Sequence, residues 1–181
     1  MYMSGVPVLR QYLTEWSELV YDGMHGNGLY GHSDSSWADN PDDLHSTSGY
    51  VFLLTNAVIS WYSCKQRTAA QSTTEAKYMQ LADAGNQAKW YRIFMEELGY
   101  NVDIPILILE NNKGAVDLSL NPVTGRKSKH IPLKFHVIRD YVENKDVEII
   151  RTPSGEVLAD GLTKPYAWIK LKHFVPGLSL V

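Results

Sequence analysis

The chain has 181 residues, of which 44% are hydrophobic and 20% are charged, as in ordinary soluble globular domains. This length suffices for one well-buried domain, and no apolar run approaches the ~20 residues that a membrane-spanning helix needs. The net charge of −3 lacks the basic excess typical of proteins that bind nucleic acid through its phosphates, although a local basic stripe is compatible with it. The single cysteine, Cys64, excludes an internal disulfide framework and favours the cytosol or the nucleus.

The first half of the chain predicts three short strands. They are expected at residues 29–34, 48–54 and 57–62. Thr55-Asn56 separates the last two strands, and a two-residue connection of this kind predicts a hairpin.

A long helix is predicted to follow these strands. Ser72-Thr73-Thr74-Glu75 has the pattern of a capping box, with Ser72 as the N-cap and Glu75 at the third helical position. Apolar residues then recur at spacings of three and four, which indicates one buried stripe: Leu81, Ala84, Ala88, Tyr91, Met95 and Leu98. Gly99 is expected to end the helix.

The second half of the chain alternates strands and helices. Strands are expected at 106–109 and 147–150, and helices at 115–120, 133–142 and, with a break near Pro165, 157–174. Crossover helices between later strands imply parallel pairing through right-handed connections. Three tryptophans are expected to pack in the core: Trp37, Trp61 and Trp90.

Seven stretches of the chain share one further pattern. They are residues 31–38 (GHSDSSWA), 46–52 (STSGYVF), 59–61 (ISW), 72–79 (STTEAKYM), 111–115 (NNKGA), 128–131 (SKHI) and 158–165 (LADGLTKP). In this order and spacing they resemble the ribonuclease H domain of copia-type LTR retrotransposons, the C-terminal part of a Pol-type polyprotein. The resemblance implies an α/β fold with a mixed five-stranded sheet, three antiparallel strands then two parallel, and helices on both faces. Residues 1–28 resemble the connection from the reverse transcriptase, and residues 29–181 the ribonuclease H-like domain.

The resemblance also implies a chemistry. Enzymes of this family hydrolyse the RNA of an RNA–DNA hybrid with two Mg²⁺ or Mn²⁺ ions, which four carboxylates bind. The first and fourth of these positions match Asp34 and Asp160, the expected metal ligands of this chain. The second and third match Lys77 and Asn111, where the family has a glutamate and an aspartate.

Two neighbouring acids are alternatives for the missing carboxylates. Glu75 lies about 200° around the helix from Lys77, whereas Lys77 lies four residues before Leu81 on the buried stripe. Glu110 precedes Asn111, and successive residues of a strand point to opposite faces, so Glu110 serves only if the strand end bulges or shifts by one residue.

The four matched positions then carry a net charge of −1, whereas four carboxylates carry −4. We therefore expect an impaired or inactive nuclease, with Mg²⁺ or Mn²⁺ as in the family or with no metal, retained as a module that binds nucleic acid or protein and not a membrane. Two alternatives stay open. One is an active magnesium-dependent hybrid nuclease that uses Glu75 or Glu110, and the other is a protein-interaction module only.

Candidate nucleic-acid contacts lie in two places. Arg126, Lys127 and Lys129 form a basic segment that either contacts phosphates or is a solvated loop. Ser72 and Thr73 match polar residues that contact the hybrid in this fold, although Ser72 is also the expected helix cap.

Overall fold

The computed structural model describes residues 28–39, 42–100, 105–121, 131–164 and 174–179. The predicted connection segment therefore lies outside the described residues, apart from Gly28. The elements in chain order are β1 (Leu29–Ser35), β2 (Thr47–Leu54), β3 (Ala57–Lys65), α2 (Thr73–Glu97), β4 (Ile106–Glu110), α3 (Lys113–Leu120), η2 (Leu133–His136), α4 (Val137–Glu143), β5 (Val147–Arg151), η3 (Ser154–Glu156) and α5 (Asp160–Thr163).

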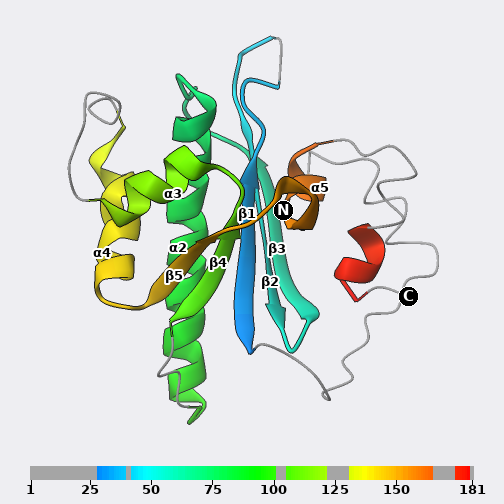
Figure 1. The fold of residues 1–181 in the computed structure, drawn as a ribbon, viewed down its shortest axis with the longest axis vertical. Helices are drawn as coiled ribbons and strands as arrows, with labels where there is room; N and C mark the ends of the chain where they lie inside the picture. The colour runs from blue at the N-terminus through cyan, green and yellow to red at the C-terminus, as the bar shows by residue number, and fades with distance from the viewer. Residues whose placement is uncertain (1–27, 40–41, 101–104, 122–130, 165–173, 180–181) are drawn as a thin grey trace.

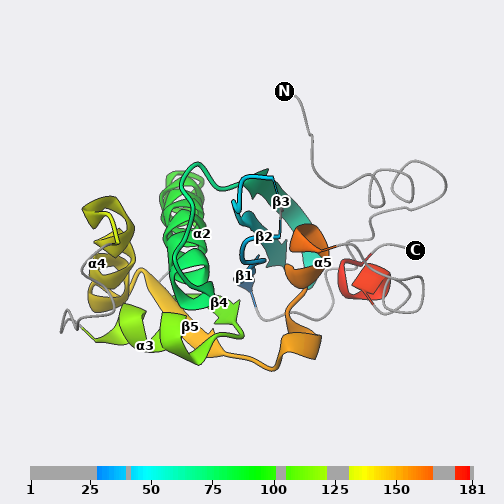
Figure 2. The same cartoon turned by 90° about the horizontal axis from the view of Figure 1, so that it is seen from above.

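The strands form one five-stranded mixed sheet in the order β3-β2-β1-β4-β5 (Figure 1). The β1–β2 and β2–β3 pairs are antiparallel, and the β1–β4 and β4–β5 pairs are parallel. Helices α2 and α4 cover one face of the sheet and α5 lies on the other (Figure 2). The predicted fold class is confirmed.

The hairpin between β2 and β3 follows from its turn residues. Thr55 and Asn56 have φ values of 49° and 68°, as a type I′ turn requires, and Leu54 pairs with Ala57. Such a turn matches the twist of the two strands, so the predicted hairpin is confirmed.

The central strands are buried on both faces. Phe52 packs on the α2 side with Leu81 and Ile108, and its neighbours Val51 and Leu53 pack on the α5 side. Because residue direction alternates along a strand, β2 supplies apolar side chains to both clusters.

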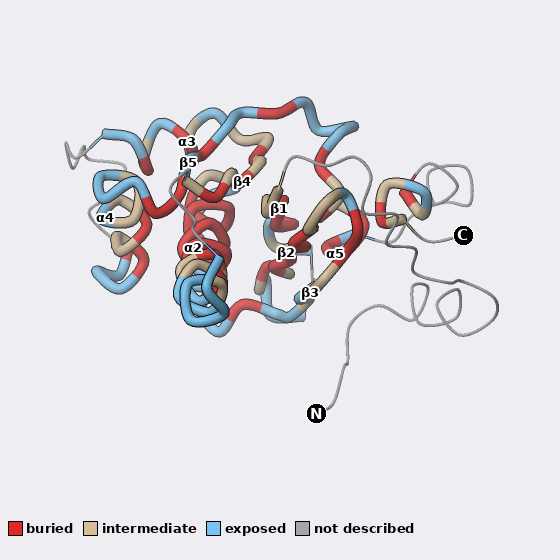
Figure 3. Tube along the Cα trace, turned by 90° about the horizontal axis from the view of Figure 1, so that it is seen from below, coloured by how far each residue is buried: buried red, intermediate tan, exposed pale blue. Residues whose placement is uncertain are grey.

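Helix α2 begins as predicted, but its predicted stripe is buried only as far as Tyr91, with Met95 partly buried and Leu98 exposed. Ser72 is its N-cap, and the Ser72 hydroxyl accepts the Glu75 N–H at 3.2 Å. Figure 3 shows its buried residues along the sheet-facing side, where the stripe is buried from Leu81 to Tyr91. The C-terminal turns extend past the ends of the strands in Figure 1, so Leu98 is 56% exposed. None of the helices within the described ranges is long and apolar enough to cross a membrane.

Two expectations of the sequence are wrong. The three tryptophans are about half exposed rather than in the core: Trp37 48%, Trp61 51% and Trp90 53%. Within 157–164 only α5 is helical, because Val157 has an extended backbone and the single helical turn begins at Asp160. Val157, Ala159 and Leu162 are thereby all buried, which a continuous helix at this spacing does not achieve.

Candidate functional site

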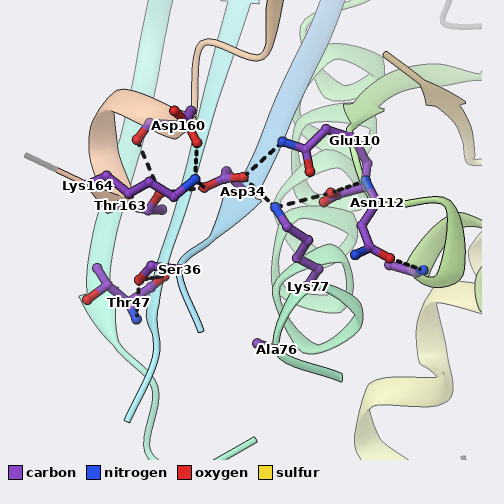
Figure 4. Close-up of polar contacts among 12 residues, drawn as sticks. Asp34, Ser36, Thr47, Ala76, Lys77, Glu110, Asn112, Asp160, Thr163 and Lys164 are labelled. Atoms are coloured by element: carbon purple, nitrogen blue, oxygen red, sulfur yellow. Dashed lines mark hydrogen bonds and ion pairs between the residues drawn. The ribbon is translucent and has the colours of Figure 1, made fainter. Parts of the chain in front are cut away.

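Asp34 is the centre of a polar cluster at the end of β1. Its carboxylate is fully buried, and side chains from α2, β4 and α5 meet it (Figure 4). Gly49 on β2 pairs with Asp34, and a Cβ there would lie 2.9 Å from atoms of both Leu162 and Thr163. The glycine therefore lets α5 approach the sheet beside Asp34.

Lys77 reaches Asp34 from α2. Its Nζ lies 2.5 Å from Asp34 Oδ1 and 3.5 Å from Glu110 Oε1. Lys77 is buried, as its place four residues before Leu81 predicts. One ammonium group thus lies between two carboxylates.

Glu110 and Asn111 both reach the cluster. Glu110 is fully buried, and its Oε1 accepts the Asn112 N–H at 3.0 Å. The Asn111 amide donates from Nδ2 to Asp34 Oδ1 at 3.4 Å. The expected alternation does not separate them, because β4 ends at Glu110 and Asn111 lies beyond the strand.

Asp160 joins the cluster on the α5 side. The Lys164 ammonium pairs with Asp160 Oδ1 and lies 3.6 Å from Asp34 Oδ2. The Thr163 hydroxyl donates to the same Oδ2 atom of Asp34. Thr163 and Lys164 belong to the motif at residues 158–165, which by itself gives them no role. Their places three and four residues after Asp160, on one helical turn, are the signal in the sequence that could have indicated one.

Glu75 belongs to the start of α2. Its Oε2 accepts the N–H of Gln71 at 2.8 Å. In a standard capping box this acid would instead accept the N–H of the N-cap, Ser72, which is the next residue. The acid thus holds the chain as it enters the helix, which is the role that the capping pattern predicts in slightly shifted form.

Charge and burial set the protonation of the cluster. Burial raises the pKa of Glu110 to about 7, although Lys77 acts in the opposite sense. Burial also acts to raise the pKa of Asp34, but Lys77, Thr163 and Lys164 outweigh it and lower that pKa. With Glu110 ionised, three carboxylates and two ammonium groups leave a net charge of −1, and protonation of Glu110 makes the cluster neutral.

The residues of this cluster do not fit a pair of divalent metal ions. An ammonium about 4 Å from an incoming Mg²⁺ repels it by several kcal/mol, even at an effective dielectric of about 20. Within the described residues, no group of three or more His, Cys, Asp or Glu side chains is arranged to hold a metal. The acids that converge on Asp34 are neutralised by lysines of the chain itself.

The expected nucleic-acid contacts are only partly placed. Ser72 and Thr73 are exposed at the start of α2, where Ser72 is also the cap. Arg126, Lys127 and Lys129 lie outside the described residues.

Comparisons with known proteins give the ancestry of this arrangement. The chain is 34% identical over 180 residues to the retrovirus-related Pol polyprotein from transposon RE2 of Arabidopsis thaliana, covering 99% of the chain and 12% of the polyprotein. The Pol polyprotein from transposon TNT 1-94 of Nicotiana tabacum is 33% identical over 136 residues, covering 75% of the chain and 10% of the polyprotein. No protein-family profile matches the chain.

Solved structures agree on the fold. LC11-RNase H1, isolated from compost by a metagenomic approach, matches 76% of this chain and 93% of its own, with a TM-score of 0.55 at 17% identity. RNase H1 from the halophilic archaeon Halobacterium salinarum matches 76% of this chain and 95% of its own, with a TM-score of 0.52 at 14% identity. The chain has a ribonuclease H-like fold, and its homologues are retrotransposon Pol polyproteins.

The resemblance inferred from the sequence motifs is confirmed at the level of family and fold. This ribonuclease H-like domain spans 12% of the length of the RE2 polyprotein that it matches.

Proposed function

We propose that this ribonuclease H-like domain no longer cleaves RNA–DNA hybrids by a two-metal mechanism and serves as a binding module. The observation that carries the proposal is the position of Lys77, whose Nζ lies 2.5 Å from Asp34 Oδ1 at the centre of the site. The resemblance inferred from the sequence motifs implies a metal-binding glutamate at this position.

The chemistry of the neighbouring groups supports the same conclusion. Two-metal catalysis needs several hard anionic oxygens around two divalent ions, which stabilise the attacking and leaving oxygens. Here Asn111 directs an amide nitrogen at Asp34, and Lys164 neutralises Asp160. Both changes lower the affinity of the cluster for cations.

RNA–DNA hybrid is the proposed ligand of the binding module. LC11-RNase H1, which shares the fold, has been crystallised in complex with an RNA/DNA hybrid. Thr73 is exposed at the start of α2, and the basic residues Arg126, Lys127 and Lys129 are proposed phosphate contacts. We place such a module in the cytosol or the nucleus, the compartments that a single cysteine favours.

An active nuclease is the second candidate, because Glu110 does reach the cluster. A metal could use Asp34, Glu110 and Asp160 if Lys77 withdrew from between the first two. Withdrawal would leave the buried carboxylates facing the incoming ion, so this candidate needs a rearrangement of α2 or of the Lys77 side chain.

A cleavage assay separates these two candidates. We expect no cleavage of a labelled RNA–DNA hybrid in Mg²⁺ or Mn²⁺ above the level of Asp34→Asn. Cleavage by the natural chain that disappears in Asp34→Asn would overturn the proposal. As a positive control, Lys77→Glu and Asn111→Asp restore the family's acids, and Glu110→Ala removes the additional carboxylate. We expect this triple variant to gain affinity for metal.

Hybrid binding needs a separate measurement. We expect binding to weaken steeply as salt rises, because phosphate contacts release counterions. Substituting Arg126, Lys127 and Lys129 with glutamine should reduce the salt dependence. Lack of binding at low salt would instead favour a module that binds only protein.

A further inference from the structure

Glu110 is an unusual residue at its position. It is the last residue of a buried parallel strand, and the alternate residues before it, Ile106 and Ile108, belong to the core beneath α2. Glu110 continues this buried row with a fully buried carboxylate. A carboxylate in such a place is unfavourable unless a cation or hydrogen-bond donors compensate it.

The compensation of Glu110 is one-sided. Its Oε1 accepts the Asn112 N–H and lies 3.5 Å from Lys77 Nζ. Its Oε2 has no hydrogen-bond partner among the described residues. Lys77 is therefore the cation that stabilises this carboxylate within the described part of the chain.

Lys77 in turn depends on two elements other than its own. Asp34 Oδ1 at the end of β1 and Glu110 Oε1 at the end of β4 lie on either side of its ammonium group. Strands β1 and β4 are parallel neighbours, so their carboxyl ends meet beneath the first turns of α2. A buried ammonium at this point bridges two strands and a helix.

We propose that Asp34 and Glu110 form a buried ammonium-binding site in which Lys77 is the permanent occupant. Glu110 acts as the positioning residue that holds the Lys77 ammonium, and the cluster clamps β1, β4 and α2 together without a metal. The inference rests on the proposed loss of metal-dependent cleavage, because a seated ammonium keeps the centre of the site closed to metal.

The clamp predicts that one substitution has opposite effects in two backgrounds. In the natural chain Glu110→Leu removes a partner of a buried ammonium, so the midpoint of thermal unfolding should fall by on the order of 10 °C. In the Lys77→Met background Glu110 has lost its cation and is a buried polar group with only the Asn112 N–H to compensate it, so replacing it with leucine should raise the midpoint. Additive effects, with Glu110→Leu destabilising both backgrounds equally, would overturn the proposal.

A matched control uses the other lysine of the cluster. Lys164→Met removes an ammonium that pairs with Asp34 and Asp160, whereas the cation beside Glu110 is that of Lys77, so Glu110→Leu should stay destabilising in that background. If Lys77→Met alone does not fold, the double variant should still fold, because residue 110 is then apolar and Asp34 keeps its contacts with Asn111, Thr163 and Lys164. A double variant that is also unfolded would contradict the clamp.

Chemical rescue tests the nature of the ligand. Lys77→Ala removes the ammonium and leaves room beside Asp34 and Glu110. Ethylammonium chloride at millimolar concentrations should raise the unfolding midpoint of Lys77→Ala in a saturable way, but not that of the natural chain or of Lys77→Ala with Glu110→Leu. Rescue by Mg²⁺ and not by ethylammonium would show a divalent-metal site and overturn the proposal.

The outcomes remain distinct from those of the cleavage assay. If Glu110→Leu has opposite effects in the two backgrounds and the chain nevertheless cleaves hybrid, the proposed function is refuted and the buried ammonium-binding site is supported. If the chain does not cleave hybrid and Glu110→Leu has the same effect in both backgrounds, the proposed function is supported and the buried ammonium-binding site is refuted.

Discussion

The two lysines that approach Asp34 come from opposite sides and differ in exposure. The side chain of Lys77 is 7% exposed and pairs with Asp34 and Glu110, whereas that of Lys164 is 45% exposed and pairs with Asp34 and Asp160. Water and salt screen an exposed pair, so it contributes little to stability. A buried pair can contribute little overall and yet be costly to break, because removal of one partner leaves a charge without compensation. Similar contacts on one aspartate therefore have different consequences.

The two lysines also differ in how accessible their ion pairs are to solvent and solutes. Helix α2 and the sheet exclude solvent from the ion pairs of Lys77, so these pairs form when the domain folds. The Lys164 side faces solvent on α5, so its ion pair can exchange with salt or a ligand.

Loss of the buried ammonium should produce the largest effect. Lys77→Met leaves Asp34 and Glu110 buried without their shared cation, so the free energy of unfolding should fall by about 3–5 kcal/mol at neutral pH. Urea denaturation followed by circular dichroism measures this change. A loss below about 1 kcal/mol is typical of an exposed surface ion pair, and it would show that the ion pairs of Lys77 and Lys164 do not differ in stability as stated.

Acid should weaken the α5 side through His32. Burial lowers the pKa of His32 to about 4 from 6.5, and its Nδ1 accepts the Leu158 N–H at 3.3 Å, just before α5. Between these pH values the unfolded chain binds a proton that the folded chain does not. The free energy of unfolding should therefore fall as pH drops from 6.5 to 4, by roughly 3 kcal/mol in total.

His32→Asn is the matched control, because its side-chain oxygen can accept the Leu158 N–H and does not titrate in this range. The difference in stability between the natural chain and this variant should depend on pH with the sign just given. A difference that is constant from pH 4 to 6.5 would contradict the assignment of a neutral His32.

The hydroxyl of Thr163 should have an intermediate effect. It donates to Asp34 Oδ2, so Thr163→Val removes a hydrogen bond to a buried charge and should cost about 2 kcal/mol. Thr163→Ser keeps the hydroxyl and should recover most of that loss. Equal destabilisation by serine and valine would assign the effect to the methyl group instead.

The exposed ammonium should have the smallest effect. Lys164→Met should change the free energy of unfolding by less than about 1 kcal/mol, and the change should shrink further in 1 M salt. Measuring Lys77→Met under the same two salt conditions sharpens the contrast, because the buried pair should respond much less to salt. A larger loss for Lys164→Met than for Lys77→Met would reverse the comparison.

Sequence patterns predicted the fold well where the information was local. The two-residue hairpin connection, the N-cap at Ser72 and the helical stripe as far as Tyr91 each depend on residues close together in the chain. The exposure of Trp90 and Leu98 could not be predicted in this way, because it depends on how far α2 extends past the sheet.

The candidate site shows the same division. The direction of Lys77 followed from the helical period, and its burial agrees. The sequence did not predict that Glu110 and Asn111 both reach the cluster. The end of a strand cannot be located to one residue from sequence, and the alternation of side chains stops at that end. The roles of Thr163 and Lys164 needed the three-dimensional approach of α5, which Gly49 permits.

The covalent attachment of the central cation has a consequence for the behaviour of the protein in cells. A bound metal ion is shared with every competing chelator and nucleotide, and its occupancy follows the free concentration of the ion. The Lys77 ammonium is part of α2, so its occupancy follows folding alone. The domain should keep the same stability in excess EDTA as in millimolar magnesium, and its cluster should be complete as soon as the chain has folded.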